Sequence, residues 1–214
     1  MDYAILEKKV NDKEFIKELI SEYWFLTDDI LNEDIYYALE GYLYPNTYEF
    51  YKDATLEDIL RRILNNTNKV LQSVKDDIEK SNYTTHEILT MASIVEKEAV
   101  SYTDREKVAQ VIYTRLDKKM SLGMDVTSYY GVQKDMKESL TKNDLNDNNP
   151  YNTRLVTFLG LPVGPICNPS IESIKAVLNP ADTNYIYFFA DITTGNVYFT
   201  DNASEFENFK KIYG

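Results

Sequence analysis

Apolar side chains recur three or four residues apart through much of this chain. The first such series contains Phe15, Leu19, Ile20, Tyr23 and Trp24. This spacing predicts two short helices between residues 12 and 40, the second near 27–39. Thr55, followed by acidic residues, is typical of a helix N-cap, so we expect the next helix to run from there to about residue 80.

The same periodicity predicts the later helices. They are expected at residues 84–100, capped by Thr84 or Thr85; at 103–119, capped by Thr103 or Asp104; at 170–178; and at 203–212. Residues 120–169 are rich in Asn, Asp, Gly and Pro, and a long irregular segment of this kind is usually functional or disordered.

Strand signals are few. The block LEGYLYPNTYEF predicts a loop that leads into a short strand. YIYFFAD and NVYFTD, joined by ITTG, predict a C-terminal β-hairpin. The expected fold class is therefore α+β: a helix-rich domain with a small antiparallel β component and a C-terminal hairpin.

The helix at 84–100 carries two charges in an apolar setting. At about 100° per residue, Ile88, Ala92 and Val95 form one stripe, and the opposite face is polar. Glu96 and Glu98 both fall inside the apolar arc. A carboxyl group in such a place is costly to ionise, so its pKa is expected to rise, as a general acid requires. The alternative is that both glutamates lie at the helix edge and pair with Lys97, Arg105 or Arg115.

Composition excludes several classes of function. The net charge of −12 and the pI near 4.6 argue against nucleic-acid binding and against a basic membrane-binding patch. One cysteine, Cys167, and one histidine, His86, leave no disulfide and no zinc cluster. A catalytic triad would have to use His86 at a helix start. No apolar run in these residues reaches the length of a membrane span, and we expect neither a transmembrane helix nor a signal peptide within them.

Four blocks in order resemble the YceG-like family of endolytic murein transglycosylases. They are LEGYLYPNTYEF (39–50), ASIVEKEA (92–99), VAQVIYTRLDKKMSLGMDVTSYYG (108–131) and YNTRLVTFLGLPVGPICNPSIESIKAVLNPADTNYIYFF (151–189). Together they cover most of residues 39–200, which makes the resemblance far more specific than a single short motif.

The resemblance implies that the first glutamate of EKE, Glu96, is catalytic. In this family the acid protonates the glycosidic oxygen between N-acetylmuramic acid and N-acetylglucosamine inside glycan strands. The same group then takes the proton of the C6 hydroxyl, which attacks the anomeric carbon and leaves a 1,6-anhydro end. One carboxyl group thus does the work that ordinary glycosidases divide between two. Glu98 is expected to be a structural partner of a nearby arginine.

The resemblance also suggests which residues line the cleft. Substrate contacts are expected from Asp125, Thr127, Tyr130, Tyr151, Asn152, Thr153 and Asn168, because hydroxyl and amide groups bind sugars and tyrosine stacks on them. Supporting roles are expected for Glu98, Glu40, Tyr44, Pro162 and Gly164. Loop geometry is the alternative for the Pro and Gly residues, and a loop cap is the alternative for Asp125.

This chain departs from the family pattern near the expected cleft. Gly123 replaces a glutamine, Val126 a proline, and Arg154 a tyrosine, while Asn46 stands in place of an aspartate. The change at Gly123 puts in doubt any contact that the glutamine makes to substrate. Arg154 either contacts an acidic peptide stem or is merely solvated.

The resemblance further implies a domain organisation. Residues 1–40 are expected to be an N-terminal helical segment that includes the tail of a truncated LysM-like module, and residues 41–214 the catalytic domain. Family members usually begin with a membrane helix, so we expect the chain to be part of an anchored protein at the outer face of the cytoplasmic membrane. The expected partners are peptidoglycan glycan strands and wall-synthesis enzymes such as penicillin-binding proteins, with no metal and no cofactor.

Two alternative functions stay open at this point. One is a non-catalytic peptidoglycan-binding module, which the departures at Gly123 and Arg154 motivate. The other is an aminodeoxychorismate lyase that uses pyridoxal phosphate, which would need a Schiff-base lysine and a phosphate-binding loop. Lys97 is on the polar face of its helix, and no Gly- and Ser-rich loop stands out.

Overall fold

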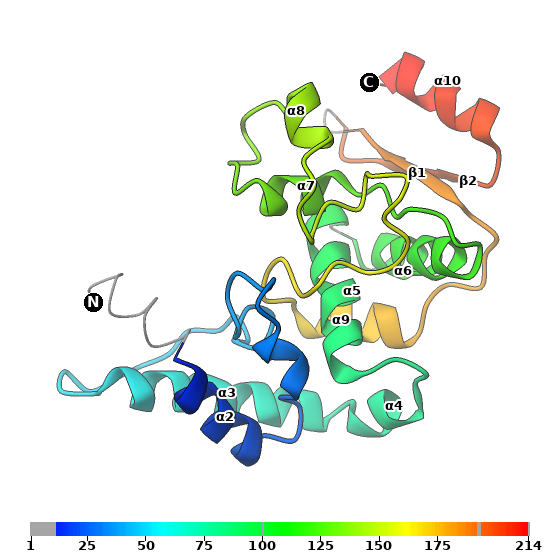
Figure 1. Cartoon of the computed structure of the whole chain (residues 1–214). Helices are drawn as coiled ribbons and strands as arrows, with labels where there is room; N and C mark the ends of the chain where they lie inside the picture. Colours follow the sequence, from blue (N-terminus) through cyan, green and yellow to red (C-terminus); the bar gives the residue numbers. More distant parts are fainter. Residues whose placement is uncertain (1–11, 100, 192–193, 214) are drawn as a thin grey trace.

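The computed structural model describes residues 12–99, 101–191 and 194–213. Its helix-rich α+β fold confirms the predicted fold class (Figure 1). The helices are α2 (Lys13–Glu22), α3 (Leu56–Gln72), α4 (Lys75–Lys80), α5 (Thr85–Glu98), α6 (Tyr102–Asp117), α7 (Asp125–Gly131), α8 (Lys142–Leu145), α9 (Ile171–Leu178) and α10 (Ala203–Tyr213), with a 3₁₀ turn, η1 (Asp28–Leu31).

The hairpin is also confirmed. Strands β1 (Tyr187–Ala190) and β2 (Val197–Thr200) pair antiparallel, with Tyr187 opposite Thr200 and Ala190 opposite Val197. Helix α10 covers this hairpin at one end of the molecule (Figure 1). The predicted turn at 192–195 lies partly outside the described residues.

Helix α5 is the most deeply buried element. Thr84 caps it, accepting a hydrogen bond from the Glu87 backbone N–H while the Glu87 carboxylate accepts one from the Thr84 N–H. His86 and every residue from Ile88 to Val95 are buried, so most of the face expected to be polar is buried, and of that face only Lys97 is exposed. Helices α6 and α9 pack along α5, and α7 lies at its C-terminal end (Figure 1).

The buried polar side chains of α5 find hydrogen-bond partners inside the protein, which offsets the cost of removing them from water. The Thr90 hydroxyl donates to the His86 carbonyl oxygen and the Ser93 hydroxyl to the Thr90 carbonyl oxygen, both at 2.7 Å. Ser93 also accepts from the Ile166 N–H at 3.0 Å. Buried polar groups with such partners carry little penalty.

The N-terminal elements share the core of the rest of the chain. Phe15, Ile16 and Leu19 of α2 belong to the same buried cluster as Leu60 and Leu64 of α3. At the surface, Arg61 of α3 forms ion pairs with two glutamates of α2. The expected boundary at residue 40 stays a prediction, and residues 1–11 of the expected LysM-like tail lie outside the described residues.

Four sequence-based predictions of local structure were wrong. The helix near 27–39 is reduced to η1 and turns, and the strand expected after residues 39–50 is absent from the described residues. The helix expected to reach residue 80 ends at Gln72, because Val74 adopts a non-helical conformation before α4. The cap of α6 is Ser101, not Thr103 or Asp104. Residues 120–169 contain α7 and α8, short helices that pack on neighbouring segments.

One side chain holds two distant loops together. The Asn168 amide oxygen accepts hydrogen bonds from the backbone N–H groups of Gly41 and Leu43, both at 2.9 Å. Gly41 has a φ of +89°, and a Cβ there would overlap the ring of Pro165. Only glycine fits this close approach. The loop before α9 is thus fixed against the loop that follows η1.

No helix in the described part of the chain is long and apolar enough to cross a membrane.

We predict that Asn168→Ala destabilises the fold, because two backbone N–H groups lose their acceptor. The expected cost is about 2–4 kcal/mol of unfolding free energy, measured by urea denaturation. Asn168→Asp keeps an accepting oxygen and is the matched control, with a smaller loss. An Asn168→Ala variant as stable as the wild type would show that this contact contributes nothing to stability.

Candidate active site

Glu96 is anchored by the start of α9. One carboxylate oxygen accepts hydrogen bonds from the Ser170 N–H at 3.1 Å, the Ser170 hydroxyl at 2.5 Å and the Ser173 hydroxyl at 2.6 Å. The other oxygen lies 3.5 Å from Arg105. Burial alone would raise the pKa of Glu96, but these hydrogen bonds and the Arg105 charge outweigh it, and the pKa is lowered. Glu96 is therefore held as a carboxylate.

Glu98, the last residue of α5, has the opposite environment. Burial, the largest effect, and the negative charge of Asp125 raise the pKa of Glu98 to about 7. A hydrogen bond from the Val126 backbone and the charges of Arg115 and Arg154 oppose this rise. The C-terminal end of a helix also disfavours a negative charge. At neutral pH, Glu98 is thus divided between its protonated and ionised forms.

The pKa shifts of the two glutamates are the reverse of those expected. The raised pKa predicted for Glu96 is wrong, because Ser170 and Ser173 stabilise its ionised form. Its pairing with Arg105 confirms the alternative of a structural ion pair. Glu98, expected to pair with an arginine, forms no ion pair within the described residues, and its carboxyl group is the one with the raised pKa.

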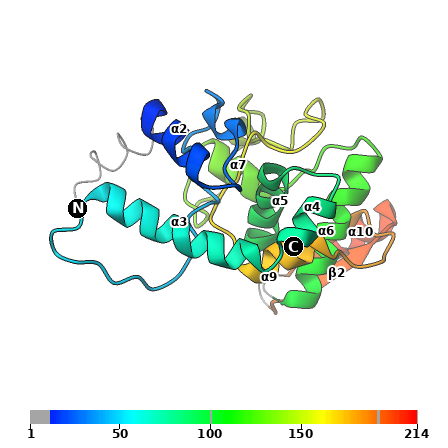
Figure 2. The same cartoon turned by 90° about the horizontal axis from the view of Figure 1, so that it is seen from below.

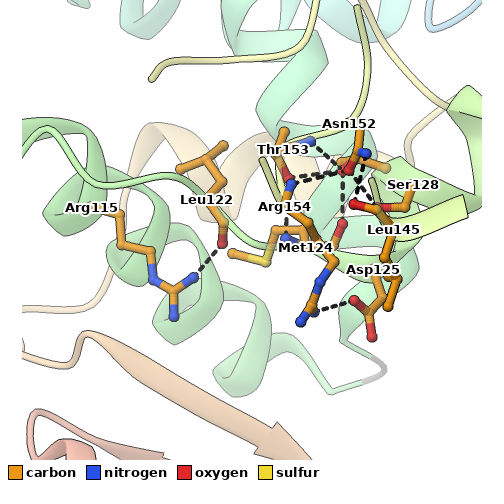
Figure 3. Close-up of polar contacts among 10 residues, drawn as sticks. Arg115, Leu122, Met124, Asp125, Ser128, Leu145, Asn152, Thr153 and Arg154 are labelled. Atoms are coloured by element: carbon orange, nitrogen blue, oxygen red, sulfur yellow. Dashed lines mark hydrogen bonds and ion pairs between the residues drawn. The ribbon is translucent and has the colours of Figure 1, made fainter. Parts of the chain in front are cut away.

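Asp125 is exposed at the first position of α7 and forms an ion pair with Arg154. Figure 3 shows the Arg154 guanidinium directed at the Asp125 carboxylate. The charges of Asp125, Arg115 and Arg154 therefore all change the proton affinity of the Glu98 carboxyl group. Arg154, one of the departures from the family pattern, is part of this site and is not merely solvated.

Arg115 of α6 is fixed by backbone oxygens. Its Nε donates to the Ile186 carbonyl oxygen at 2.7 Å and its guanidinium to the Leu122 carbonyl oxygen (Figure 3). Next to Leu122, Gly123 has a φ of +60°, in the left-handed region that favours glycine. The glycine that replaces the family's glutamine thus fits a turn that Arg115 binds. No sequence signal pointed to this role of Arg115.

Thr127 and Thr153 form a buried hydroxyl pair beneath the site. Their hydroxyl oxygens lie 2.8 Å apart, Thr127 donates to the Met124 carbonyl oxygen, and Thr153 accepts from the Met124 N–H. Both residues have 0% exposed surface. In this structure they shape the turn before α7, and their expected contact with substrate stays a prediction.

Asn152 and Tyr151 are likewise part of the scaffold. The Asn152 amide oxygen accepts from the Ser128 hydroxyl and the Arg154 N–H, and its nitrogen donates to two backbone carbonyl oxygens (Figure 3). Its hydrogen-bonding capacity is thus filled. The Tyr151 hydroxyl accepts from the Tyr36 N–H, and its ring packs against that of Tyr130, 4.7 Å between centroids.

The remaining predicted residues lie in two loops, one between η1 and α3 and the other between α8 and α9. Asn168 binds backbone N–H groups, as described above. Burial raises the pKa of Glu40, and the nearby charge of Lys97 opposes this rise. The Tyr44 N–H donates to Thr67. Pro162 and Gly164 are buried, and Gly164 lies against His86. Loop geometry, the alternative reading for these two, agrees with their positions.

Sequence reasoning gave no role to Ser170 and Ser173. Ser170 caps α9 by accepting from the Ser173 N–H at 3.4 Å, and both serines donate to Glu96. A serine just before a helix is a recognisable cap signal, but its second partner lies 74 residues away in sequence. No group of three or more potential metal ligands occurs in the part of the chain that the structure describes.

Comparisons with known proteins agree with this architecture. The model of the YceG-like family matches residues 3–211. An endolytic murein transglycosylase of Bacillus subtilis is 41% identical over 207 residues, and one of Streptococcus pneumoniae is 34% identical over 203. The crystal structure of a YceG-like protein of Listeria monocytogenes superposes with a TM-score of 0.92 and 38% identity, covering 98% of this chain and 68% of that one.

The chain spans only part of these curated relatives. The alignments cover 96% and 92% of this chain but 56% of the Bacillus protein and 36% of the Streptococcus protein.

We predict that Arg154→Ala raises the pKa of Glu98 further. The substitution removes a positive charge and leaves the Asp125 carboxylate without its partner, and both effects favour the protonated form of Glu98. Asp125→Asn should lower that pKa instead. The measurement is an NMR titration of the Glu98 side-chain carboxyl carbon, and shifts of the same sign in both variants would contradict this electrostatic picture.

We also predict opposite pH effects on stability for the two glutamates. Between pH 4.5 and 7 the native state keeps the Glu98 proton that the unfolded chain releases, so this residue's contribution falls as pH rises. Relative to wild type, Glu98→Gln should therefore gain up to about 3 kcal/mol between pH 4 and pH 8. The lowered pKa of Glu96 contributes stability above its unfolded value, so Glu96→Gln should lose stability over the same range.

Urea denaturation at the two pH values measures both variants against wild type. A loss of relative stability with pH in Glu98→Gln would show that the pKa of Glu98 is not raised.

Proposed function

The chain belongs to the YceG-like family, and on this basis we propose that it is the catalytic part of an endolytic murein transglycosylase. Its substrate is the glycan strand of peptidoglycan. It cleaves the bond between N-acetylmuramic acid and N-acetylglucosamine within the strand and leaves 1,6-anhydro ends. The names of two curated relatives, 41% and 34% identical, support this activity.

The observation that carries the mechanism is the environment of Glu98. A general acid works best when its pKa lies near the working pH, and the pKa of Glu98 is about 7. Glu96, anchored as a carboxylate by two serines and Arg105, is poorly suited to give up a proton. We therefore propose Glu98 as the acid and keep Glu96, which the sequence resemblance implies, as the second candidate for that role.

The reaction needs one carboxyl group in two states. Protonated Glu98 donates its proton to the glycosidic oxygen as the bond to the anomeric carbon breaks. The resulting carboxylate then accepts the proton of the C6 hydroxyl, whose oxygen forms the new bond to that carbon. No water is consumed, and the acid is restored for the next cycle. Because the nucleophile belongs to the sugar, proximity comes with the substrate.

The neighbours of Glu98 keep both states accessible. Asp125 and burial favour the protonated form, while Arg115, Arg154 and the Val126 backbone favour the carboxylate. These opposing influences keep the pKa of Glu98 near neutral, which suits a group that must both donate and accept a proton.

The proposed place of action follows from the substrate. An enzyme that cuts peptidoglycan works on the wall side of the cell, and we propose the outer face of the cytoplasmic membrane, with an anchor supplied by a longer protein. Penicillin-binding proteins remain proposed partners. Because the relatives extend beyond this chain, the activity of the isolated domain is expected to be weaker than that of the full protein.

We predict that Glu98→Gln lowers the release of anhydro-ended fragments at least about 100-fold, because glutamine cannot donate a proton to the glycosidic oxygen. Glu96→Gln should retain activity at a pH and temperature where it is folded. The assay digests purified peptidoglycan and detects anhydromuramic ends by mass spectrometry, with circular dichroism as the control for folding.

The reverse result, an inactive Glu96→Gln and an active Glu98→Gln, would overturn the assignment and restore Glu96 as the acid. Binding of glycan by the wild type with no anhydro product would instead favour a non-catalytic binding module.

A further inference from the structure

A cavity of about 1160 Å³ lies on the outer side of α3. One wall is the chain segment 46–54, and the other is the face of α3 that carries Asp58, Arg61, Asn65 and Lys69. Figures 1 and 2 both show the N-terminal end of α3, and the loop that leads into it, far from α7 and the C-terminal end of α5. We call it the α3 cavity. The site around Glu98 does not include it.

The segment 46–54 begins within the block LEGYLYPNTYEF (39–50), and only the first half of that block packs in the core. The first half of that block is buried, as Leu39 and Tyr42 show, and Asn168 fixes its backbone. Its second half, Asn46 to Phe50, leaves the core and lines the cavity. Packing of the core therefore does not account for the side chains of this second half.

Aromatic side chains line the first wall. The rings of Tyr48 and Phe50 stack with 6.2 Å between centroids and 25° between planes. Phe50 is 40% exposed, and Tyr51 is 87% exposed. Exposed aromatic rings of this kind are unfavourable in water and are common where a ligand covers them. Apolar faces of sugar rings stack on such side chains.

Amide groups with unused hydrogen-bonding capacity face them from α3. The Asn65 oxygen accepts from the Tyr23 hydroxyl, and its NH₂ group has no partner among the described residues. The Asn66 NH₂ group donates to the Tyr48 hydroxyl, and its oxygen likewise has no partner in the described part of the chain. One donor and one acceptor in the cavity lining are thus available, and an N-acetyl group or a pair of sugar hydroxyls can use both.

The charges of the cavity balance. The lining carries three cations, Arg61, Arg62 and Lys69, and three carboxylates, Glu49, Asp53 and Asp58. Arg61 also pairs with two glutamates of α2 that lie outside the lining. A cavity without net charge favours a neutral polar ligand over an acidic peptide or a phosphate-bearing chain.

We propose that the α3 cavity binds a stretch of N-acetylated sugar chain, apart from the place where the chain is cut. This inference rests on the proposed function only in that the glycan strand being cleaved is the natural ligand. A strand bound at both places is held away from its ends, which favours cleavage at internal bonds.

The binding test uses the folded chain with Glu98→Gln, so that binding is observed without cleavage. The probe is a β-1,4-linked tetramer of N-acetylglucosamine, followed by two-dimensional amide NMR and by titration calorimetry. We expect shifted amide signals in segment 46–54 and in α3. Phe50→Ala and Asn66→Ala should each weaken this binding about 3- to 10-fold.

Tyr102→Ala is the matched control, because Tyr102 is an aromatic residue of similar exposure, 42%, outside the cavity lining. It should leave the affinity unchanged. Tyr51→Ala gives a second cavity variant whose side chain is too exposed to affect folding.

Two results would overturn the proposal. One is that the tetramer shifts no signals in segment 46–54 or α3, or that the cavity variants bind it as Tyr102→Ala does. The other is that only fragments with acidic peptide stems bind and that Arg62→Ala abolishes this binding, which would make the cavity a peptide site.

A cleavage assay separates this proposal from the proposed function. With Glu98 intact, Phe50→Ala should raise KM for long strands and leave kcat unchanged. If the wild type cleaves but cavity variants bind and cleave normally, the cavity proposal alone fails. If the tetramer binds in a Phe50-dependent way and no cleavage occurs, the proposed function alone fails.

Discussion

The burial of α5 on all its faces is the constraint on which the rest of the structure depends. A helix that is buried from Ile88 to Val95 must have neighbours on every side, and α6, α9 and the loop around Ile166 supply them. Its polar side chains are then forced to find partners inside the protein. The last turn leaves this buried stretch, and this is where Glu96 and Glu98 lie.

The two glutamates show how neighbours, and not helix position, decide the chemistry of a carboxyl group. Both lie in the last turn of the same helix and both are partly buried, yet the pKa of one is lowered and that of the other raised. Glu96 meets the hydroxyl and N–H donors at the start of α9. Glu98 meets the charge of Asp125 and has no ion pair among the described residues. Hydrogen bonds to the charged form outweigh desolvation in the first case only.

Much of the fold could be predicted from periodicity and cap signals, since α5, α9 and the hairpin agree with the residues that indicated them. The site could be predicted only in part. The pattern of the helix correctly indicated carboxyl groups in an apolar arc, but their proton affinities depend on Ser170, Asp125 and Arg154, which lie 27 to 74 positions away. Such partners are set by tertiary packing. Asn152 and Thr153 matched a family block, but nothing in the sequence showed that their polar atoms bind the protein's own backbone.

The contact between Glu96 and α9 has a consequence for the order of the α5 terminus. The last turn of a helix ordinarily frays, because its final carbonyl groups lack partners. Here the Glu96 side chain connects that turn to Ser170, Ser173 and Arg105, two residues before the helix ends. The backbone that carries Glu98 is thereby immobilised before any ligand arrives. The Glu96 carboxylate thus fixes the position of its neighbour, and the conformational entropy of ordering this turn is lost on folding.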